Sequence, residues 1–211
     1  MEHTEALHRQ VHTPFLNDHP PDASQSTDPA TAWCTAQLTD DVYWRSIAIS
    51  QAAQAVLALA TGLTVHRLTL PADRTCVEAG RVLLQGPLDA QDFAVSALGG
   101  GQAHAIWLDA SGYPHAELRR CVLEMCSAGN SAVVDHYERQ GMVIDRKRAV
   151  AHALRLLSAP GTFAAIEAVA DRLGRKYELD GEQVTVITEQ HHLACPRSQY
   201  PLRPTRTSQN H

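Results

Sequence analysis

Histidine and cysteine are the residues in this sequence with the widest chemical range, and they are scattered. The chain has 12 His and 5 Cys among 211 residues, with no Cys-x-x-Cys pair and no two His spaced four apart on a predicted helix. Two loose groups have some metal-ligand character: His191 and His192 with Cys195, and Asp109 with His104 and His115 on either side. Neither has the spacing of a zinc site, so we predict no metal and no other cofactor.

A cysteine nucleophile would need a histidine beside it to take its proton. Cys121 could meet one in space, but no local pattern identifies such a pair. The odd number of cysteines also gives no disulfide framework, and free thiols in a reducing cytoplasm are the simpler interpretation.

A long apolar helix is predicted from Val42 to Thr61. Thr39-Asp40-Asp41 supplies an N-cap and first-turn acids, and Gly62 is a plausible C′ residue that ends it. The run is apolar almost all round, which is typical of a buried central helix. Its middle also carries three polar residues, Ser50, Gln51 and Gln54.

The surrounding elements predict a mainly α fold with a small β-ribbon or sheet, an α+β class. Strands are expected at Val65–Leu70 and Arg81–Gln85. Helices are expected over the remaining stretches: from Asp89 to about Trp107 with an interruption at Gly99-Gly100-Gly101, His115 to Ser127, Ser131 to Leu157 with a possible break at Gly141, Phe163 to Leu173, and a short one beginning at Asp180–Val184.

The chain is predicted to hold one domain with two loose ends. Residues 1–35 are rich in His, Pro, Asp, Ser and Thr, which predicts a flexible N-terminal arm, and residues 195–211 read as a flexible C-terminal tail. The domain then spans residues 36–194, which includes nearly all of the apolar periodicity.

The first helix and strand resemble the peptidase domain of FtsH-type zinc metallopeptidases. That family carries His-Glu-Ala-Gly-His-Ala-Val on a helix, then apolar residues, a Gly, and a strand similar to Val-His-Lys-Val-Thr-Ile. Here the string from Ser50 to Val56 reads Ser-Gln-Ala-Ala-Gln-Ala-Val, Gly62 follows, and the strand from Val65 to Leu70 reads Val-His-Arg-Leu-Thr-Leu. The register is unbroken, and the resemblance implies an FtsH-peptidase-like helical domain.

The resemblance also implies that the family's chemistry is absent. Ser50 stands at the first zinc-binding His, Gln51 at the Glu that acts as general base, and Gln54 at the second His. A Ser hydroxyl and a Gln amide are poor substitutes for imidazole, and an amide cannot take up a proton near neutral pH. We expect a degenerate active site without catalytic residues.

Two later segments extend the resemblance over roughly residues 42–188. Ser96 to Ala103 is similar to the family's Ala-Leu-Gly-Gly-Arg-Ala-Ala-Glu helix without its Arg and Glu, and Leu179 to Val184 is similar to its closing Leu-x-Gly-Glu-Glu-Val. The family's third zinc ligand is an Asp near the start of the next helix. The matching neighbourhood, Ser111 to His115, has no Asp in register, and Asp109 lies several residues early.

A peptidase cleft holds an extended peptide against an edge strand, and that interaction needs no zinc. We therefore expect a catalytically inactive metallopeptidase-like protein that binds a peptide or protein segment, for example as an accessory protein in the bacterial biosynthesis of a ribosomally made, modified natural product. The strand from Val65 to Leu70 is the expected edge. Its peptide-binding candidates are Val65, His66, Arg67, Leu68 and Thr69.

Two alternatives remain open. One is an enzyme, hydrolase-like, with a relocated metal or a repurposed cleft acting on a peptide. The other is an interaction module, such as a homodimer, that uses an apolar helix face. An open groove at Ser50, Gln51 and Gln54 would favour ligand binding, whereas side chains packed over them would favour assembly.

The composition argues against two classes of partner, nucleic acids and membranes. The formal net charge is −5 and no Lys/Arg cluster beyond Arg146-Lys147-Arg148 is present, which argues against nucleic acid. No stretch reaches the ~20 apolar residues of a membrane span, and the N-terminus has no secretory apolar region. We expect a cytoplasmic protein without a membrane partner.

Overall fold

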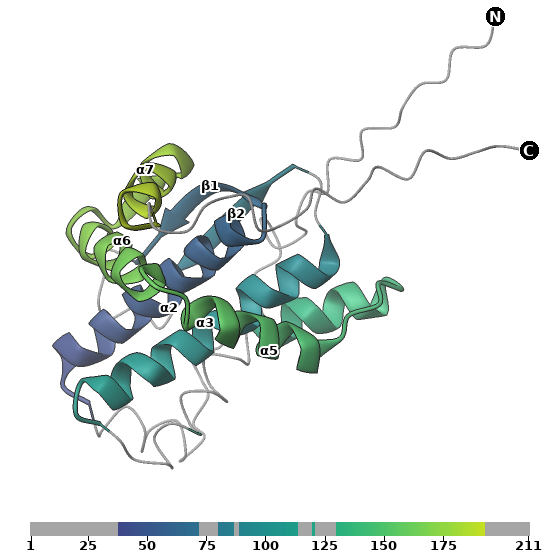
Figure 1. The fold of residues 1–211 in the computed structure, drawn as a ribbon, viewed down its shortest axis with the longest axis horizontal. Helices are drawn as coiled ribbons and strands as arrows, with labels where there is room; N and C mark the ends of the chain where they lie inside the picture. Colours follow the sequence, from purple (N-terminus) through teal and green to yellow (C-terminus); the bar gives the residue numbers. More distant parts are fainter. Residues whose placement is uncertain (1–37, 72–79, 87–88, 114–119, 121–129, 193–211) are drawn as a thin grey trace, which may run out of the picture.

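The computed structural model describes residues 38–71, 80–86, 89–113, 120 and 130–192. The predicted arm and tail, residues 1–35 and 195–211, lie outside these ranges, as does nearly all of the expected helix from His115 to Ser127. The predicted class is confirmed: helices dominate, and the described strands form one small antiparallel sheet (Figure 1).

Helix α2 (Asp40–Ala60) runs through the centre of the fold. It contacts α3 (Ala90–Ala110), α6 (Thr162–Lys176) and strand β1 (Thr64–Thr69). Its middle is buried on every side, since all residues from Ser46 to Ala58 are covered. A helix that is enclosed all round must be mainly apolar, which explains the composition of this stretch and makes its few polar residues informative.

Both ends of α2 follow from local sequence. Thr39 is the N-cap, as predicted, although its hydroxyl makes no capping bond, and Asp40 and Asp41 lie in the first turn. At the other end Gly62 has a φ of 88°. The Leu63 amide donates to the Ala58 carbonyl and the Gly62 amide to that of Leu59. This is a Schellman motif, which needs the left-handed conformation that glycine adopts readily.

The sheet has the strand order β2-β1-β3. β2 (Arg81–Gln85) and β3 (Glu178–Asp180) both pair antiparallel with β1, with Leu68 opposite Val82 on one side and Leu179 on the other. The inward residues Val65, Leu68 and Leu179 join the core. β3, which had no counterpart among the predicted elements, leads directly into α7 (Gly181–His192).

Helix α3 differs from the prediction. It continues from Ala90 to Ala110 without interruption at Gly99-Gly100-Gly101, although three consecutive glycines disfavour a helix. The reason is packing, because Gly99 lies against α2 and α5 (Arg146–Leu157) and Gly100 lies against α2. By contrast, the predicted break at Gly141 is confirmed: residues 130–139 are helical, Gly141 has a φ of 85°, and α5 begins at Arg146.

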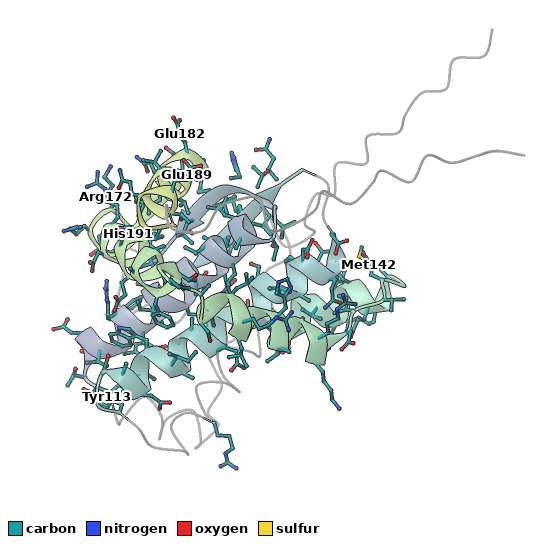
Figure 2. The ribbon with its side chains drawn as sticks, in the orientation of Figure 1. Tyr113, Met142, Arg172, Glu182, Glu189 and His191 are labelled. Atoms are coloured by element: carbon teal, nitrogen blue, oxygen red, sulfur yellow. The ribbon has the colours of Figure 1, made fainter. Side chains whose placement is uncertain are left out.

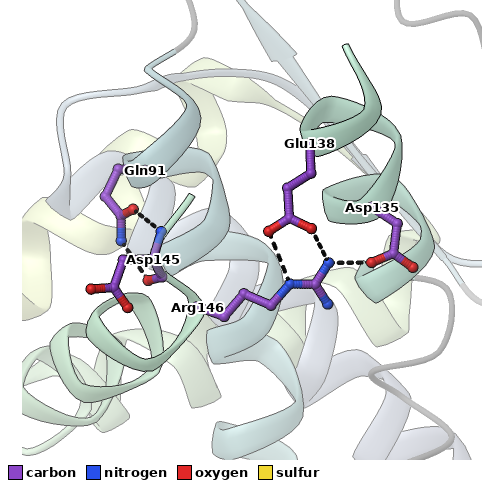
Figure 3. A network of polar contacts seen from close by, with 5 residues as sticks. All are labelled: Gln91, Asp135, Glu138, Asp145 and Arg146. Atoms are coloured by element: carbon purple, nitrogen blue, oxygen red, sulfur yellow. Dashed lines mark hydrogen bonds and ion pairs between the residues drawn. The ribbon is translucent and has the colours of Figure 1, made fainter. Parts of the chain in front are cut away.

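A polar clasp holds the start of α5 (Figure 3). The Gln91 side chain accepts from the Asp145 amide at 2.9 Å and donates to the Asp145 carbonyl at 3.0 Å. Arg146 contacts Glu138 through two nitrogens and also pairs with Asp135. These bonds to Glu138 and Asp135 raise the pKa of Arg146. Since each carboxylate already has its cation, the clasp is structural.

Among the described helices, none by itself has both the length and the apolar character needed to cross a membrane. α5 and α6 reach that combination only when taken together, across a bend of 88°.

Candidate functional site

The three candidate polar residues of α2 lie together in the buried middle of the helix. Ser50, Gln51 and Gln54 are 4%, 6% and 7% exposed, and they are called the α2 polar cluster below. The residues around them on the same helix are Ala, Val, Ile and Leu. The cluster is therefore covered rather than displayed on a surface, and what covers it decides what it can do.

Helix α3 covers the Gln54 side. The Ser96 hydroxyl donates to the Gln54 carbonyl oxygen at 2.8 Å. A Cβ on Gly100 would lie 2.7 Å from Gln54 Cγ and 2.9 Å from the Ser50 carbonyl oxygen. Both distances are closer than carbon atoms normally approach, so only glycine fits here. The backbones of α2 and α3 thus come close together beside the cluster.

Strand β2 begins on the Gln51 side. A Cβ on Gly80, the residue just before β2, would lie 3.2 Å from Gln51 Cγ and would also collide with the Thr69 carbonyl oxygen. α2 contacts β2 in this region. Gly80 therefore brings the chain across Gln51 as β2 starts, and the cluster lies between α3 and the first residues of the outer strand.

Two atoms of the cluster have no hydrogen-bond partner within the described part of the chain. They are the Gln51 side-chain oxygen Oε1 and the Gln54 side-chain nitrogen Nε2, and both are inaccessible to solvent. A buried amide atom without a partner costs about 1–3 kcal/mol in stability. One of these atoms accepts a hydrogen bond and the other donates one. Native proteins rarely leave such buried atoms without a partner unless something else supplies the bonds.

The buried residues that the structure describes around the cluster are uncharged. His104 lies on α3 one turn beyond Gly100 and is 2% exposed. Burial lowers its pKa from 6.5 to about 3, so the ring is neutral near pH 7. The buried polar residues of the described ranges are all Ser, Thr, Gln or His: Ser46, Ser50, Gln51, Gln54, Ser96, His104, Thr162 and Thr188. An ion placed at the cluster would find no buried opposite charge among them.

The expectation that the strand from Val65 to Leu70 forms an edge is wrong. It is the central strand of the sheet, with β2 paired on one side and β3 on the other. Val65 and Leu68 are core residues, whereas His66 and Arg67 are exposed and Thr69 is partly covered. Arg67 pairs with Glu178 of β3 at 3.6 Å. A peptide could not pair along β1 without displacing a neighbouring strand.

The described members of the two loose metal-ligand groups are His104, Asp109 and His191. Within the residues that the structure describes, no three His, Cys, Asp or Glu side chains are close enough to hold a metal ion. His191 is exposed on α7, and Figure 2 labels it together with Glu182 and Glu189 of the same helix. His115, Cys121 and Cys195 lie outside the described ranges. Asp109 and His104 belong to the same helix, five residues apart.

Sequence reasoning missed Gly80 and misinterpreted Gly100. An isolated Gly just before a strand often marks a close approach of backbone or ligand, and that signal was available at Gly80. Gly100 lies in a run that was interpreted as a helix interruption, although close helix packing also requires glycine. A scan against models of known protein families and a search of curated proteins found no match to this chain.

Proposed function

We propose that this chain is a non-hydrolytic, peptidase-like protein that binds a peptide or protein segment as an added strand. The observation that carries the proposal is the pair of buried, unpartnered amide atoms, Gln51 Oε1 and Gln54 Nε2. One acceptor and one donor, from residues three apart on the same helix, complement the N–H and C=O groups that a peptide backbone offers. A bound peptide would thus remove the energetic penalty that the free chain carries at these atoms.

The binding edge is β2 rather than β1. β2 is an outer strand of the sheet, with β1 on one side and no described strand on the other. An outer strand presents unpaired N–H and C=O groups that can pair with another extended segment. Val82 and Leu84 pack against the core, and Leu83 is half-buried between them in sequence. Because Gly80, the residue just before β2, lies against Gln51, a peptide that pairs along β2 and continues past its start would pass close to Gln51.

The same residues support the non-hydrolytic half of the proposal. A zinc peptidase needs metal ligands and a general base around the scissile bond. The α2 polar cluster offers a hydroxyl and two amides, none of which takes up a proton near neutral pH. The order of helix, Gly62 and β1 is the part of the chain on which the resemblance to FtsH-type peptidases rests. These residues could hold and orient a peptide without cleaving it.

The burial of the cluster predicts how a peptide enters. Gln51 and Gln54 are covered in the free chain, so a ligand that reaches them must displace what lies over them. Among the described contacts, the one at Gly80 is the natural place, because it is formed by a strand end rather than by a long helix. Binding would then be slower than simple docking, since a local shift must accompany it.

A selection experiment tests the proposal. The full chain is immobilised and used to select from a random peptide library displayed on phage, in parallel with the double variant Gln51→Leu/Gln54→Leu. The control is Gln190→Leu, the same change at an exposed position of α7. We expect the parent and the control to enrich the same sequences and the double variant to lose them. The synthetic peptide should bind by calorimetry and stay intact by mass spectrometry with zinc added.

Two results would overturn the proposal. One is failure of the parent chain to enrich any sequence, and the other is equal enrichment by the double variant. Cleavage of the selected peptide would overturn the non-hydrolytic part alone.

A homo-oligomeric interaction module is the second candidate, and the burial of the α2 polar cluster favours it. Sedimentation equilibrium distinguishes the two. A mass that rises with concentration, together with an empty selection, would favour self-association. A constant monomer mass with an enriched peptide would favour the binding protein.

A further inference from the structure

The α2 polar cluster also constrains which part of a peptide it can hold. This step rests on the proposed function, because it concerns the ligand of the same site. The relevant observations are the identity of the unpartnered atoms, the absence of buried charge around them, and the glycines that flank them. Each restricts the ligand in a different way.

The unpartnered atoms require a ligand that both donates and accepts. Gln51 Oε1 can only accept a hydrogen bond, and Gln54 Nε2 can only donate one. A carboxylate offers acceptors alone and an ammonium offers donors alone, so either ion would leave one of the two glutamines unsatisfied. An amide carries an N–H or NH₂ donor next to a carbonyl acceptor. It satisfies both.

The lack of charge in the described interior also favours an uncharged ligand. The described interior contains no buried Asp, Glu, Lys or Arg, and His104 is neutral near pH 7 because burial lowers its pKa to about 3. An ion buried beside the cluster would lose its hydration without gaining an opposite charge, which is strongly unfavourable. A neutral amide loses only hydrogen bonds to water, and the two glutamines replace them.

The glycines show that the cluster has close neighbours on both sides. A Cβ on Gly100 would lie 3.0 Å from Gln54 Nε2, and one on Gly80 would lie 3.2 Å from Gln51 Cγ. A side chain at either position would press on one of the two glutamines. Glycine at both positions therefore leaves the two side-chain amides where they are, and a ligand that bonds to them must fit between close neighbours.

We infer that the α2 polar cluster recognises an uncharged amide group, so that it accepts internal segments of a peptide and rejects free chain ends. Two sources could supply that group: a main-chain peptide unit, or the carboxamide of an Asn or Gln side chain. Both have the same donor and acceptor chemistry, and small probes separate them.

The test uses side-chain NMR signals of the intact chain labelled with ¹⁵N-glutamine. The Gln54 NH₂ signals are identified by their loss in Gln54→Leu, and the exposed Gln140 serves as internal control. The chain is titrated separately with N-methylacetamide, acetamide, acetate and methylammonium at constant ionic strength. N-methylacetamide stands for a peptide unit and acetamide for a side-chain carboxamide.

We expect saturable shifts of the Gln54 signals with an amide probe and none with acetate or methylammonium, while Gln140 stays unchanged. A larger response to N-methylacetamide than to acetamide would assign the main chain as the source, and the reverse would assign a side chain. Equal shifts with acetate, or no shift with any probe, would overturn the inference. An amide response without an enriched peptide would instead refute the proposed function and leave the inference standing.

Discussion

Replacing Gly100 with Ala should destabilise the protein, although Ala is the better helix former. In an open helix the change from Gly to Ala stabilises by about 0.5–1 kcal/mol. At Gly100 the added Cβ would lie 2.7 Å from Gln54 Cγ and 2.9 Å from the Ser50 carbonyl oxygen. The second atom belongs to the backbone of a buried helix, so no change of rotamer relieves the contact.

The magnitude follows from setting these two effects against each other. Forcing an extra methyl group into a packed interior costs about 1–3 kcal/mol. After subtraction of the gain in helix propensity, the free energy of unfolding should fall by about 1–2 kcal/mol for Gly100→Ala. Gly174 in α6 is the matched control, because it is helical with nothing within 4 Å of an added Cβ. There the same substitution should raise the free energy by about 0.5–1 kcal/mol.

Urea unfolding followed by circular dichroism measures both variants. With a slope of about 2 kcal/mol per molar urea, the two midpoints should differ by roughly 1 M, with the parent between them. A further variant, Gln54→Ala, removes Cγ and Nε2 but leaves the Ser50 carbonyl, so the double variant Gly100→Ala/Gln54→Ala should recover only part of the loss. If Gly100→Ala and Gly174→Ala shifted the midpoint equally, the close approach of α2 and α3 would be refuted.

Three further predictions concern buried or strained groups. The double variant Gln51→Leu/Gln54→Leu should raise the free energy of unfolding by about 1–3 kcal/mol for each unpartnered atom that it removes. Urea unfolding measures this change. A fall in the free energy of unfolding of the same size would mean that the amides have partners in the free chain. Burial keeps His104 neutral in the folded protein, whereas in the unfolded chain it takes up a proton below its ordinary pKa of 6.5. The free energy of unfolding therefore has its full value above pH 6.5 and declines as the pH falls toward 3. The free energy of unfolding should fall by about 2 kcal/mol at pH 5. His104→Asn should remove this pH dependence, whereas a substitution at the exposed His66 should not. The same pH dependence in His104→Asn would show that another group causes it. Tyr177 ends α6 with a φ of 62°, so Tyr177→Gly should raise stability by about 1 kcal/mol in thermal unfolding, and a fall would show that its ring packing outweighs the strain.

Elements with strong local signals could be predicted from sequence. α2 begins after Thr39 and ends at a Gly62 Schellman motif because capping chemistry is local. β2 occupies Arg81–Gln85 as expected, and Gly141 separates two helices because its left-handed conformation ends the first of them. In each case a few neighbouring residues determine the backbone, whatever the rest of the chain does.

Features that depend on distant partners could not be predicted. The helix through Gly99 and Gly100 exists because α2 and α5 pack against it, which outweighs poor local propensity. The central strand β1 was expected to be an edge for a similar reason. Its second neighbour, β3, is only Glu178–Asp180 and shows no strand pattern of its own. Likewise, the location of Ser50, Gln51 and Gln54 on a buried helix was predictable, but their enclosure by Gly100 and Gly80 was not.

The pairing of β1 with β3 has a consequence for folding. β1 lies near the start of the described chain and β3 near its end, with Arg67 opposite Asp180. The central strand therefore keeps one side unpaired until the late segment has been made and brought back, and such non-local closure is slow. During synthesis the β1–β2 hairpin would expose an edge that can pair with other nascent chains. Truncation before Glu178 should thus yield aggregation-prone protein, since the C-terminal segment completes the sheet.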